Sequence, residues 1–557
     1  MDLPAFDVVV VGAGPTGFTL AIDLGRRGIR TLLVERDSDT KEWPKMDRSN
    51  PRTMEIYRRI GFADRVRAAG YPPEASMDVF VTTRVADPPL VRLRYPTVAE
   101  CRERTDAEKG MGHPLEPYQL VAQNDIEPVL KSVAEDTANL TVRFSRELVG
   151  FEEDEEGVTV RLECADGTVE AVRGRYLAGC DGGRSFVRKA LGIELEGRGD
   201  LVALRQVTFR SESLYDALPY KGRHFYIADE TNSMIVVQGS RKDFTLNASL
   251  PEDADLEQAI RERLGIDADF TIKNSISYKF HLLLAKHYRV GRVLIAGDAA
   301  HLVPPTGGLG MNTGVGDAVD LSWKLAGTIE GWAGPRVLDS YETERRAIGR
   351  RNMDAAGRAA GGMMTWRGKC GPEVFEDTSA GAAKRDEVAR AAEVYQRWPL
   401  EMVGVELGYS YAGSDMIAEE PPAEWDTREY VPHTRPGIRI PHLWLNDGRA
   451  VQDVLGPDYN LLDLTGAAES GGLEAEFARI GVSLDVVCVD DPHAAEVYGA
   501  GLLLLRPDLH IYWRGDQLPQ DIEGLASAAT GHRGPFSDTA QVGERLGAHP
   551  GPQGDSQ

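Results

Sequence analysis

The sequence predicts an α/β protein in which a parallel βαβ fold is interrupted by an inserted sheet and followed by a separate C-terminal domain. A chain of 557 residues is longer than one hydrophobic core supports, so about three packing units are expected. The chain opens with strand, glycine turn, helix and strand over residues 6–11, 12–17, 18–24 and 31–34. The pattern of strand, loop and helix returns only at 292–296 and 312–328, after a long insertion.

The segments between and after these elements are different in composition. Residues 142–172 alternate apolar and polar side chains around Asp154–Gly157, which predicts an antiparallel hairpin or meander. Residues 201–250 are rich in Tyr, Phe, Val and Thr and predict a second sheet. The composition becomes helical over 361–435, and strand and turn signals return over 436–519. A separate C-terminal domain is therefore expected there.

Charge and cysteine usage exclude several classes of protein. The formal net charge of -24 repels phosphate backbones and anionic lipids, so neither nucleic acid nor a membrane surface is an expected partner. The five cysteines form no CxxC pair, which favours reduced thiols and a cytoplasmic location. The apolar N-terminus is broken by glycines and lacks a basic start, so it is not expected to be a secretion signal. No apolar run is long enough for a spanning helix.

The glycine turn of the first βαβ unit fits the G-x-G-x-x-G pattern at Gly12, Gly14 and Gly17, with Pro15 and Thr16 between them. The first glycine permits the turn, the second lets a pyrophosphate approach the backbone, and the third allows the helix to pack closely. Glu35 ends the next strand at the offset expected for a carboxylate that binds ribose hydroxyls, and Arg36 follows it. Together these residues predict a dinucleotide site, and the motif alone leaves FAD and NAD open.

Two further motifs and a glutamine resemble the class A flavoprotein monooxygenases, in the branch of phenol hydroxylase. They are Gly179–Arg188 with Asp181, the run from Gly291 to Asn312 with Asp298, and Gln123. The resemblance implies bound FAD, with Asp298 on the ribityl chain and the loop of Pro305, Gly308, Gly310, Met311 and Asn312 at the flavin pyrimidine edge. It also implies that NADPH or NADH binds transiently as electron donor. The start of a helix suits the anionic reduced flavin.

The C-terminal sequence adds to the resemblance. Leu503–Asp508 and Trp513–Gly515 are similar to the thioredoxin-like domain of that branch, without its redox cysteine pair, so a role in packing or in a homodimer is expected. The expected organisation is a Rossmann-like FAD-binding domain (1–75, 111–190 and 286–360), an inserted β-sheet substrate domain (76–110 and 191–285), a helical connector (361–435), a thioredoxin-like domain (436–545) and a flexible tail (546–557).

The expected reaction is hydroxylation of a phenolic ring with NAD(P)H and O₂ through a flavin C4a-hydroperoxide. A ring hydroxylase benefits from a base beside the substrate hydroxyl, because a phenolate is the better nucleophile. The resemblance places Asp47 on the family's active-site Asp, as base or substrate anchor, against the alternative of a solvated loop residue or a helix cap. Tyr226 and Tyr215 are candidate phenolic partners, although tyrosines in a sheet are usually packing residues.

Two basic residues of the same segment are expected near the cofactor. Lys45 replaces an arginine that is common in the family, so a bidentate contact is lost there. Arg52 is expected to contact the cofactor or a neighbouring carboxylate. His301 lacks a second ligand at metal-binding spacing and is interpreted as structural, so no metal is expected.

Three rival functions stay open at this point. One keeps the flavin and carries out epoxidation, Baeyer–Villiger insertion or decarboxylative hydroxylation of a polyketide-like substrate. Another is an oxygen-independent flavin reductase or dehydrogenase, and the third is a non-catalytic flavin-binding sensor. Oxygen uptake with NADPH separates the reductase or dehydrogenase from the hydroxylase, and very slow NADPH oxidation that does not depend on substrate would favour the sensor.

Overall fold

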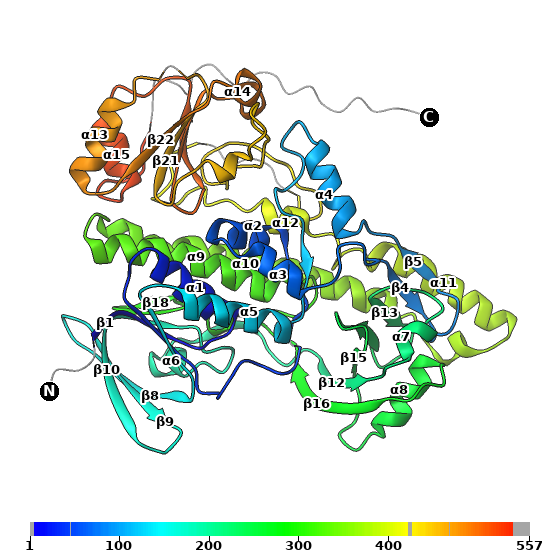
Figure 1. Cartoon of the computed structure of the whole chain (residues 1–557). Helices are drawn as coiled ribbons and strands as arrows, with labels where there is room; N and C mark the ends of the chain where they lie inside the picture. Colours follow the sequence, from blue (N-terminus) through cyan, green and yellow to red (C-terminus); the bar gives the residue numbers. More distant parts are fainter. Residues whose placement is uncertain (1–4, 45, 421–425, 467, 538–557) are drawn as a thin grey trace.

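The computed structural model describes residues 5–44, 46–420, 426–466 and 468–537. Figure 1 shows two sheet domains side by side and a C-terminal domain that lies across the long helices α9 (Leu309–Glu330) and α10 (Pro335–Arg367). The expected α/β class, with an inserted sheet and a C-terminal domain, is confirmed. Lys45 and the tail 546–557 lie outside the described residues. Within the described residues, no helix is long and apolar enough to cross a membrane.

The first domain is built on a largely parallel sheet. Its central strand β1 (Ala5–Val11) pairs in parallel with β2 (Thr31–Val34) and β10 (Val169–Gly179). Val8, Val9 and Val10 are all buried, so both faces of the sheet are covered, as expected for a parallel sheet in an α/β protein. The remaining strands are β7 (Leu140–Arg143), β19 (Val293–Ile295), the antiparallel edge β18 (Arg289–Val290) and the expected hairpin β8 (Arg146–Glu153) and β9 (Val158–Cys164).

Five α-helices, one 3₁₀ turn and three short strand pairings complete this domain and the region where it adjoins the second domain. The helices are α1 (Pro15–Arg26), α2 (Pro51–Ile60), α3 (Ala63–Ala69), α5 (Gln123–Asp136), α6 (Phe186–Ala190) and the 3₁₀ turn η1 (Gly297–Ala299). The small strands are β3 (Arg48–Ser49) with β6 (Gln119–Leu120), and β11 (Leu195–Arg198) with β17 (Leu282–Ala285) and β20 (His301–Leu302). We call β3 the border strand, because Pro44 and Asp47, just before it, accept hydrogen bonds through their carbonyl groups from Gln206 and Arg223 of the second domain.

The second domain is a seven-stranded sheet assembled from two separate stretches of sequence. Its order is β16 (Thr271–Lys279), β12 (Ala203–Arg210), β15 (Asp243–Ala248), β14 (Met234–Val237), β13 (His224–Ile227), β4 (Val79–Thr82) and β5 (Val91–Leu93). One face packs on α7 (Leu214–Ala217) and α8 (Leu256–Leu264), and the other on the end of α10 and on α11 (Ser379–Tyr395). Helix α10 continues through position 361, so the helical connector forms part of the cover of this sheet.

The C-terminal domain has the strand order of a thioredoxin fold. β21 (Tyr459–Asp463) pairs in parallel with β22 (Leu484–Cys488), and β23 (Leu502–Leu505) and β24 (Ile511–Gly515) follow on its other side as antiparallel strands. The helices are α13 (Gly471–Ile480), α14 (Pro492–Tyr498) and α15 (Ile522–Ala529), with α4 (Val98–Ala107) and α12 (Val403–Leu407) from the rest of the chain nearby. Leu502–Leu505 are all buried because alternate leucines face two different cores.

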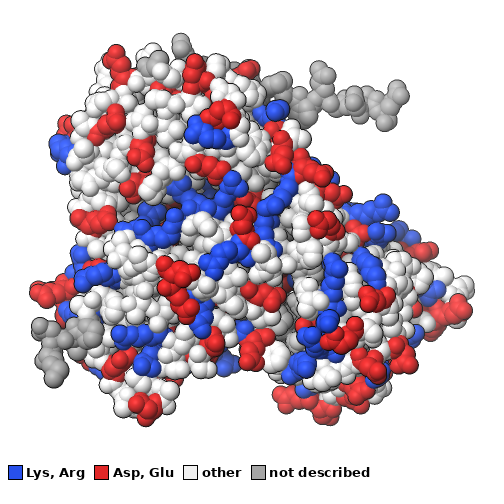
Figure 2. All heavy atoms as spheres, in the orientation of Figure 1, with Lys and Arg blue, Asp and Glu red and all other residues white. Residues whose placement is uncertain are grey.

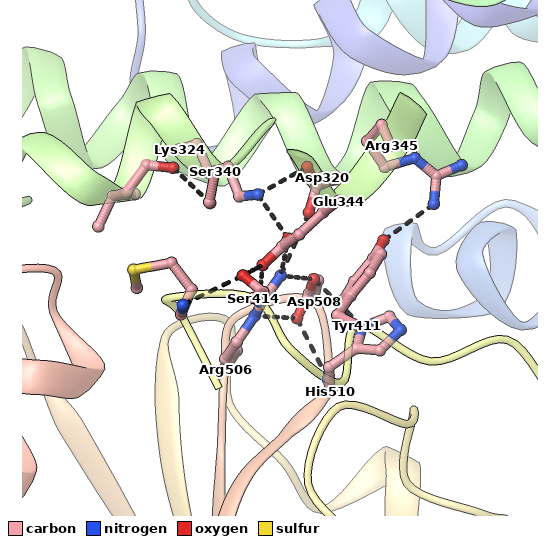
Figure 3. Close-up of polar contacts among 12 residues, drawn as sticks. Asp320, Lys324, Ser340, Glu344, Arg345, Tyr411, Ser414, Arg506, Asp508 and His510 are labelled. Atoms are coloured by element: carbon pink, nitrogen blue, oxygen red, sulfur yellow. Dashed lines mark hydrogen bonds and ion pairs between the residues drawn. The ribbon is translucent and has the colours of Figure 1, made fainter. Parts of the chain in front are cut away.

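A group of buried charges joins this domain to α9 and α10 (Figure 3). We call it the interdomain network, and it consists of Asp320, Lys324, Glu344, Arg506 and Asp508. The Arg506 guanidinium lies 2.7 Å from Glu344 and 2.6 Å from Asp508, and the Lys324 ammonium lies 2.6 Å from Glu344 and 2.9 Å from Asp320. Each of these side chains is at most 2% exposed. The C-terminal domain is therefore held by charges as well as by apolar packing.

Arginines also line the outer edge of this interface. Arg58 pairs with Asp453, and the guanidinium groups of Arg27 and Arg59 donate to carbonyl groups at 455–457. Figure 2 shows Lys and Arg gathered along this seam of an otherwise acidic molecule. Since backbone carbonyls and acids accept from these arginines, the seam is a contact between domains rather than a free basic surface.

Candidate active site

The glycine turn between β1 and α1 is shaped as its sequence predicts. Gly12 has a positive φ of 102°, and a side chain there would overlap the backbone of Cys180. A side chain at Gly17 would overlap the carbonyl of Gly12. By contrast, a side chain at Gly14 would meet nothing within 4 Å, because Gly14 caps the start of α1 and faces open space. This cradle fits a pyrophosphate against a helix N-terminus.

The carboxylate of Glu35 lies against the same turn. It accepts hydrogen bonds from the backbone N–H groups of Ala13 at 2.8 Å and Asp37 at 3.1 Å. These bonds fix the side chain at the end of β2 and leave further lone pairs on both oxygens for sugar hydroxyls. The neighbouring Arg36 side chain is 65% exposed, with Asp37 4.0 Å away.

The start of α9 lies next to this cradle. A side chain at Gly297 would come within 2.6 Å of the Thr16 hydroxyl, so η1 packs on the beginning of α1. Gly307 and Gly308 both have positive φ. The Gly308 N–H donates to the backbone carbonyl of Pro305, which is an exposed residue. A Cβ at Gly310 would lie 3.9 Å from the Asp298 carboxylate, and Met311 packs partly on the core. The glycine turn at the start of the chain and the motif from Gly291 to Asn312 therefore lie next to each other.

Asn312 connects the start of α9 to the border strand β3. Its side-chain oxygen accepts from the N–H of Asn50 at 2.9 Å, and its amide group donates to the carbonyl of Arg48 at 3.1 Å. Gln123 at the start of α5 lies on the other side of the border strand, because its N–H donates to the carbonyl of Met46. The Gln123 amide is oriented by Glu127 at 2.5 Å.

Two residues expected at the cofactor have other contacts. The Asp181 carboxylate accepts from the N–H groups of Phe186 and Val187, so it caps α6, while its backbone lies under the glycine turn. Arg52 is buried and donates to the hydroxyl of Tyr409 and the carbonyl of Asp508, so its contacts are with the C-terminal part of the chain. Of its two expected contacts, the neighbouring carboxylate is found, as Glu55 at 3.9 Å.

Asp47 belongs to a group of charged side chains at the border between the two sheets. We call it the site cluster, and it consists of Asp47, Arg48, Arg223, His224 and Glu406. The Asp47 carboxylate lies 2.7 Å from the Arg223 guanidinium and 3.4 Å from Nε2 of His224. Burial alone would raise the pKa of Asp47, but Arg223 and His224 outweigh it and hold this pKa below its ordinary value.

The second pair of the site cluster joins α12 to the border strand. Arg48 lies 2.7 Å from the fully buried carboxylate of Glu406 and stacks over the ring of Tyr118 at 5.0 Å. Burial raises the pKa of Glu406, and Arg48 opposes that rise. A side chain at Gly308 would lie 3.7 Å from Cβ of Arg48, so this pair adjoins the α9 loop.

The two candidate tyrosines are placed differently. Tyr226 is buried on the same face of β13 as His224, and burial raises the pKa of its hydroxyl to about 12. Tyr215 lies on α7, where its ring contacts the ammonium group of Lys221 at 4.9 Å and the guanidinium of Arg241 at 5.2 Å. His301 is buried and lies 2.8 Å from Asp317, which also pairs with Arg345.

Sequence reasoning missed Arg223, His224, Arg48 and Glu406. A signal was available for His224, since the period of two along a strand puts His224 and Tyr226 on one face, with Phe225 on the other. No comparable signal exists for the Arg223–Asp47 contact, which joins residues 176 positions apart. Side-chain chemistry at this border is therefore a product of tertiary structure.

Comparison with known protein families divides the chain into two matched parts. Residues 5–356 match the family described as FAD binding domain, and residues 433–535 match the family described as aromatic-ring hydroxylase, C-terminal. Together the two families span the nucleotide fold, the inserted sheet and the C-terminal domain.

Individual proteins are similar over nearly the whole chain. FAD-dependent monooxygenase apdD of Emericella nidulans is 30% identical over 94% of this chain and 90% of its own. Aklavinone 12-hydroxylase DnrF of Streptomyces peucetius is 32% identical over 84% of this chain and 92% of its own. Among solved structures, RebC with bound 7-carboxy-K252c superposes with a TM-score of 0.87 at 30% identity, covering 96% of this chain and all of that one. A ternary complex of aklavinone-11 hydroxylase with FAD and aklavinone gives 0.80 at 28% identity, covering 95% and 100%.

Proposed function

This chain belongs to the FAD-dependent aromatic-ring hydroxylases, and from that premise we propose that it hydroxylates a polycyclic phenol at the border between its two sheet domains. The observation that carries the proposal is the position of the site cluster. Asn312 ties the start of α9 to Arg48 and Asn50, and Asp47 continues from there to Arg223 on the second sheet. Polar groups of the second domain are thus held beside the loop that the flavin ring would face.

The cradle supplies the groups that FAD needs. Gly12, Gly14 and the start of α1 would receive the pyrophosphate, and Glu35 the ribose hydroxyls. Asp298 would meet the ribityl chain, and the loop from Gly308 to Asn312 the pyrimidine edge. FAD held in this way would supply the redox chemistry, for which NAD(P)H is the hydride donor and O₂ the source of the oxygen atom. Around it, the protein's own task is to orient the phenol, exclude water and accept a proton.

A polycyclic phenol is favoured over a single ring by the similar solved structures, which include RebC with 7-carboxy-K252c and aklavinone-11 hydroxylase with aklavinone. Two single-ring enzymes, 4-methyl-5-nitrocatechol 5-monooxygenase and phenol 2-monooxygenase, are also similar, at 30% and 29% identity, so simple phenols belong in the test as well. A second candidate is another oxidation of a polycyclic substrate, for example decarboxylative hydroxylation. It is supported by the similarity to RebC, which was solved with 7-carboxy-K252c.

The cellular location and the oligomeric state are proposed from the cysteines and from the family. The five cysteines are all free, which favours a reducing compartment, and we place the enzyme in the cytoplasm. A homodimer stays a prediction from the family.

The test measures NADPH and NADH oxidation by the purified yellow protein together with oxygen uptake. The panel contains phenols, hydroxybenzoates and hydroxyanthraquinones, and ¹⁸O₂ labels the product. Marked stimulation by a hydroxyanthraquinone, with one labelled oxygen in the product, supports the proposal. Oxidation that continues with another acceptor in the absence of oxygen contradicts it, and release of CO₂ from a carboxylated substrate supports the second candidate.

A further inference from the structure

We infer that His224 is the catalytic base that takes the proton from the substrate hydroxyl, while Asp47 and Arg223 are positioning residues that hold its imidazole. The inference rests on the proposed function and changes the role expected for Asp47.

Asp47 is poorly suited to accept the proton itself. Its carboxylate oxygen lies 2.7 Å from Arg223, whose side chain is only 1% exposed and is backed by the ring of Tyr71 at 4.4 Å. Protonation of Asp47 would leave a buried guanidinium without its counter-charge. Arg223 therefore keeps Asp47 ionised and makes it a weak base.

His224 has the opposite properties. Burial lowers the pKa of its imidazole, with Arg223 and Arg48 acting in the same direction, so the neutral form that accepts a proton is favoured. Asp47 acts against these effects, since the imidazolium formed by proton transfer would face its carboxylate at 3.4 Å. The same carboxylate orients the ring in both states, as a second group does for many catalytic histidines.

The position of His224 leaves it accessible to a substrate. Its side chain is 17% exposed, whereas Tyr226, two residues along the same face of β13, is buried under α10 and α11. Among the described residues, Asp47 is the single polar partner found for the imidazole, through Nε2. The other ring nitrogen, Nδ1, is therefore left for the substrate hydroxyl.

The proton-transfer step balances without any other reactant. The substrate O–H bond breaks, an N–H bond forms at Nδ1, and the electron pair of the O–H bond stays on the phenolate oxygen. The positive charge formed on the imidazole faces Asp47, and the phenolate formed on the substrate gains from the nearby Arg48. The imidazolium returns its proton to the product or to solvent before the next cycle.

The first test observes the phenol directly, without turnover. The oxidised FAD-loaded enzyme is titrated with 4-nitrophenol, whose phenolate absorbs in the visible, over a range of pH. The wild-type enzyme should hold the probe as phenolate at a lower pH than in free solution, and His224→Gln should remove this effect. His287→Gln, an exposed histidine paired with Glu342, is the matched control and should behave as wild type. The inference is overturned if the bound probe titrates in His224→Gln as it does in the wild type, or if the wild type does not lower the pH at which the probe becomes phenolate.

The second test follows the pH dependence of kcat/KM for the phenol that best stimulates NAD(P)H oxidation. The kcat/KM of the wild type should fall at low pH as His224 becomes protonated. In His224→Gln this acidic limb of the pH profile should disappear, and kcat/KM should be about 100-fold lower. Asp47→Asn should shift the limb to lower pH, because the group that raises the His224 pKa is gone. His224→Ala should regain activity with added imidazole, and failure of that rescue counts against the inference. If the wild type forms labelled product but the His224 variants show none of these changes, the inference about His224 is wrong and the proposed function still stands. If the wild type forms no labelled product at all, the proposed function itself is wrong.

Discussion

The site cluster and the interdomain network are built from the same residue types and differ in what surrounds them. In the network every charged side chain is at most 2% exposed, and Glu344 is contacted by both Lys324 and Arg506. In the site cluster Asp47 is 32% exposed and His224 17%, and one side of the imidazole has no partner among the described residues. Buried charges that are surrounded by opposite charges hold domains together, whereas charges left open on one side remain available to a substrate.

The largest expected effect comes from breaking the network at its centre. Arg506→Met leaves three buried carboxylates, Asp320, Glu344 and Asp508, without their shared cation. Removing one partner of a buried ion pair costs about 3–5 kcal/mol, so the free energy of unfolding in urea should fall by at least that amount. Arg336→Met is the matched control: Arg336 is 45% exposed and pairs with Asp415, and its loss should cost less than about 1 kcal/mol. Equal losses from the two variants would show that burial does not distinguish these pairs.

Breaking the site cluster should affect activity more than stability. Asp47→Asn removes the carboxylate that orients His224, and kcat/KM is expected to fall by about 100-fold, or roughly 2.7 kcal/mol of transition-state stabilisation. Because Asp47 is half-buried, the loss of unfolding free energy should be smaller than for Arg506→Met. Steady-state kinetics and urea denaturation of the same preparations measure both quantities. A variant with wild-type kcat/KM and lowered stability would place Asp47 in the same class as the network.

The network also has an internal imbalance that pH can reveal. Two cations, Lys324 and Arg506, face the three carboxylates of Asp320, Glu344 and Asp508. Burial raises the pKa of Asp320 to about 7, with Glu344 and Asp508 adding to the rise and Lys324 and Arg506 opposing it. A proton on Asp320 balances the charge.

The sign of the resulting pH dependence follows from this shift. A carboxyl group with a raised pKa binds its proton more tightly in the folded state, so its contribution to stability is present at low pH and is lost as pH rises towards and through 7. Asp320→Asn cannot titrate. The advantage of wild type over this variant in unfolding free energy should therefore shrink between pH 5 and 8, as measured by urea denaturation. A difference that stays constant between pH 5 and 8 would show that Asp320 is ionised throughout this range.

The contrast between the two regions also explains what the sequence could and could not predict. Elements defined by neighbouring residues were expected correctly, for example the glycine turn at 12–17 and the strand at 31–34. The thioredoxin-like order of the C-terminal sheet came from the resemblance of Leu503–Asp508 and was confirmed. These features depend on local periodicity or on motif order, which are written in the sequence.

Contacts between distant charges were not predictable in the same way. Arg506 meets Glu344 across 162 positions and Asp320 across 186, and nothing near these residues in the chain indicates the pairing. The same is true of Arg52, whose partners are Tyr409 and Asp508. The expectation that Asp47 belongs to the active site came from the family resemblance, but its partners Arg223 and His224 required the fold.

The smallest expected effect concerns the one candidate for redox chemistry in the C-terminal domain. Cys488 is exposed at the end of β22, and its thiol lies 3.8 Å from the Asp463 carboxylate. Partial burial and the negative charge of Asp463 both raise the pKa of the thiol, which makes it a poor nucleophile. Cys488→Ser should leave NAD(P)H oxidation unchanged and alter the unfolding free energy by less than about 0.5 kcal/mol.

Asp463→Ala is the informative partner of that variant. Its carboxylate accepts from the N–H groups of Thr465, Gly466 and Ala468, so its removal leaves several donors of one loop without an acceptor. We expect a measurable loss of stability from Asp463→Ala and none from Cys488→Ser. Loss of activity in Cys488→Ser, or after alkylation of this thiol alone, would mean that the C-terminal domain takes part in electron transfer. The proposed contrast would then be wrong, because the C-terminal domain would contribute to the chemistry and would not serve only as a domain held by the buried interdomain network.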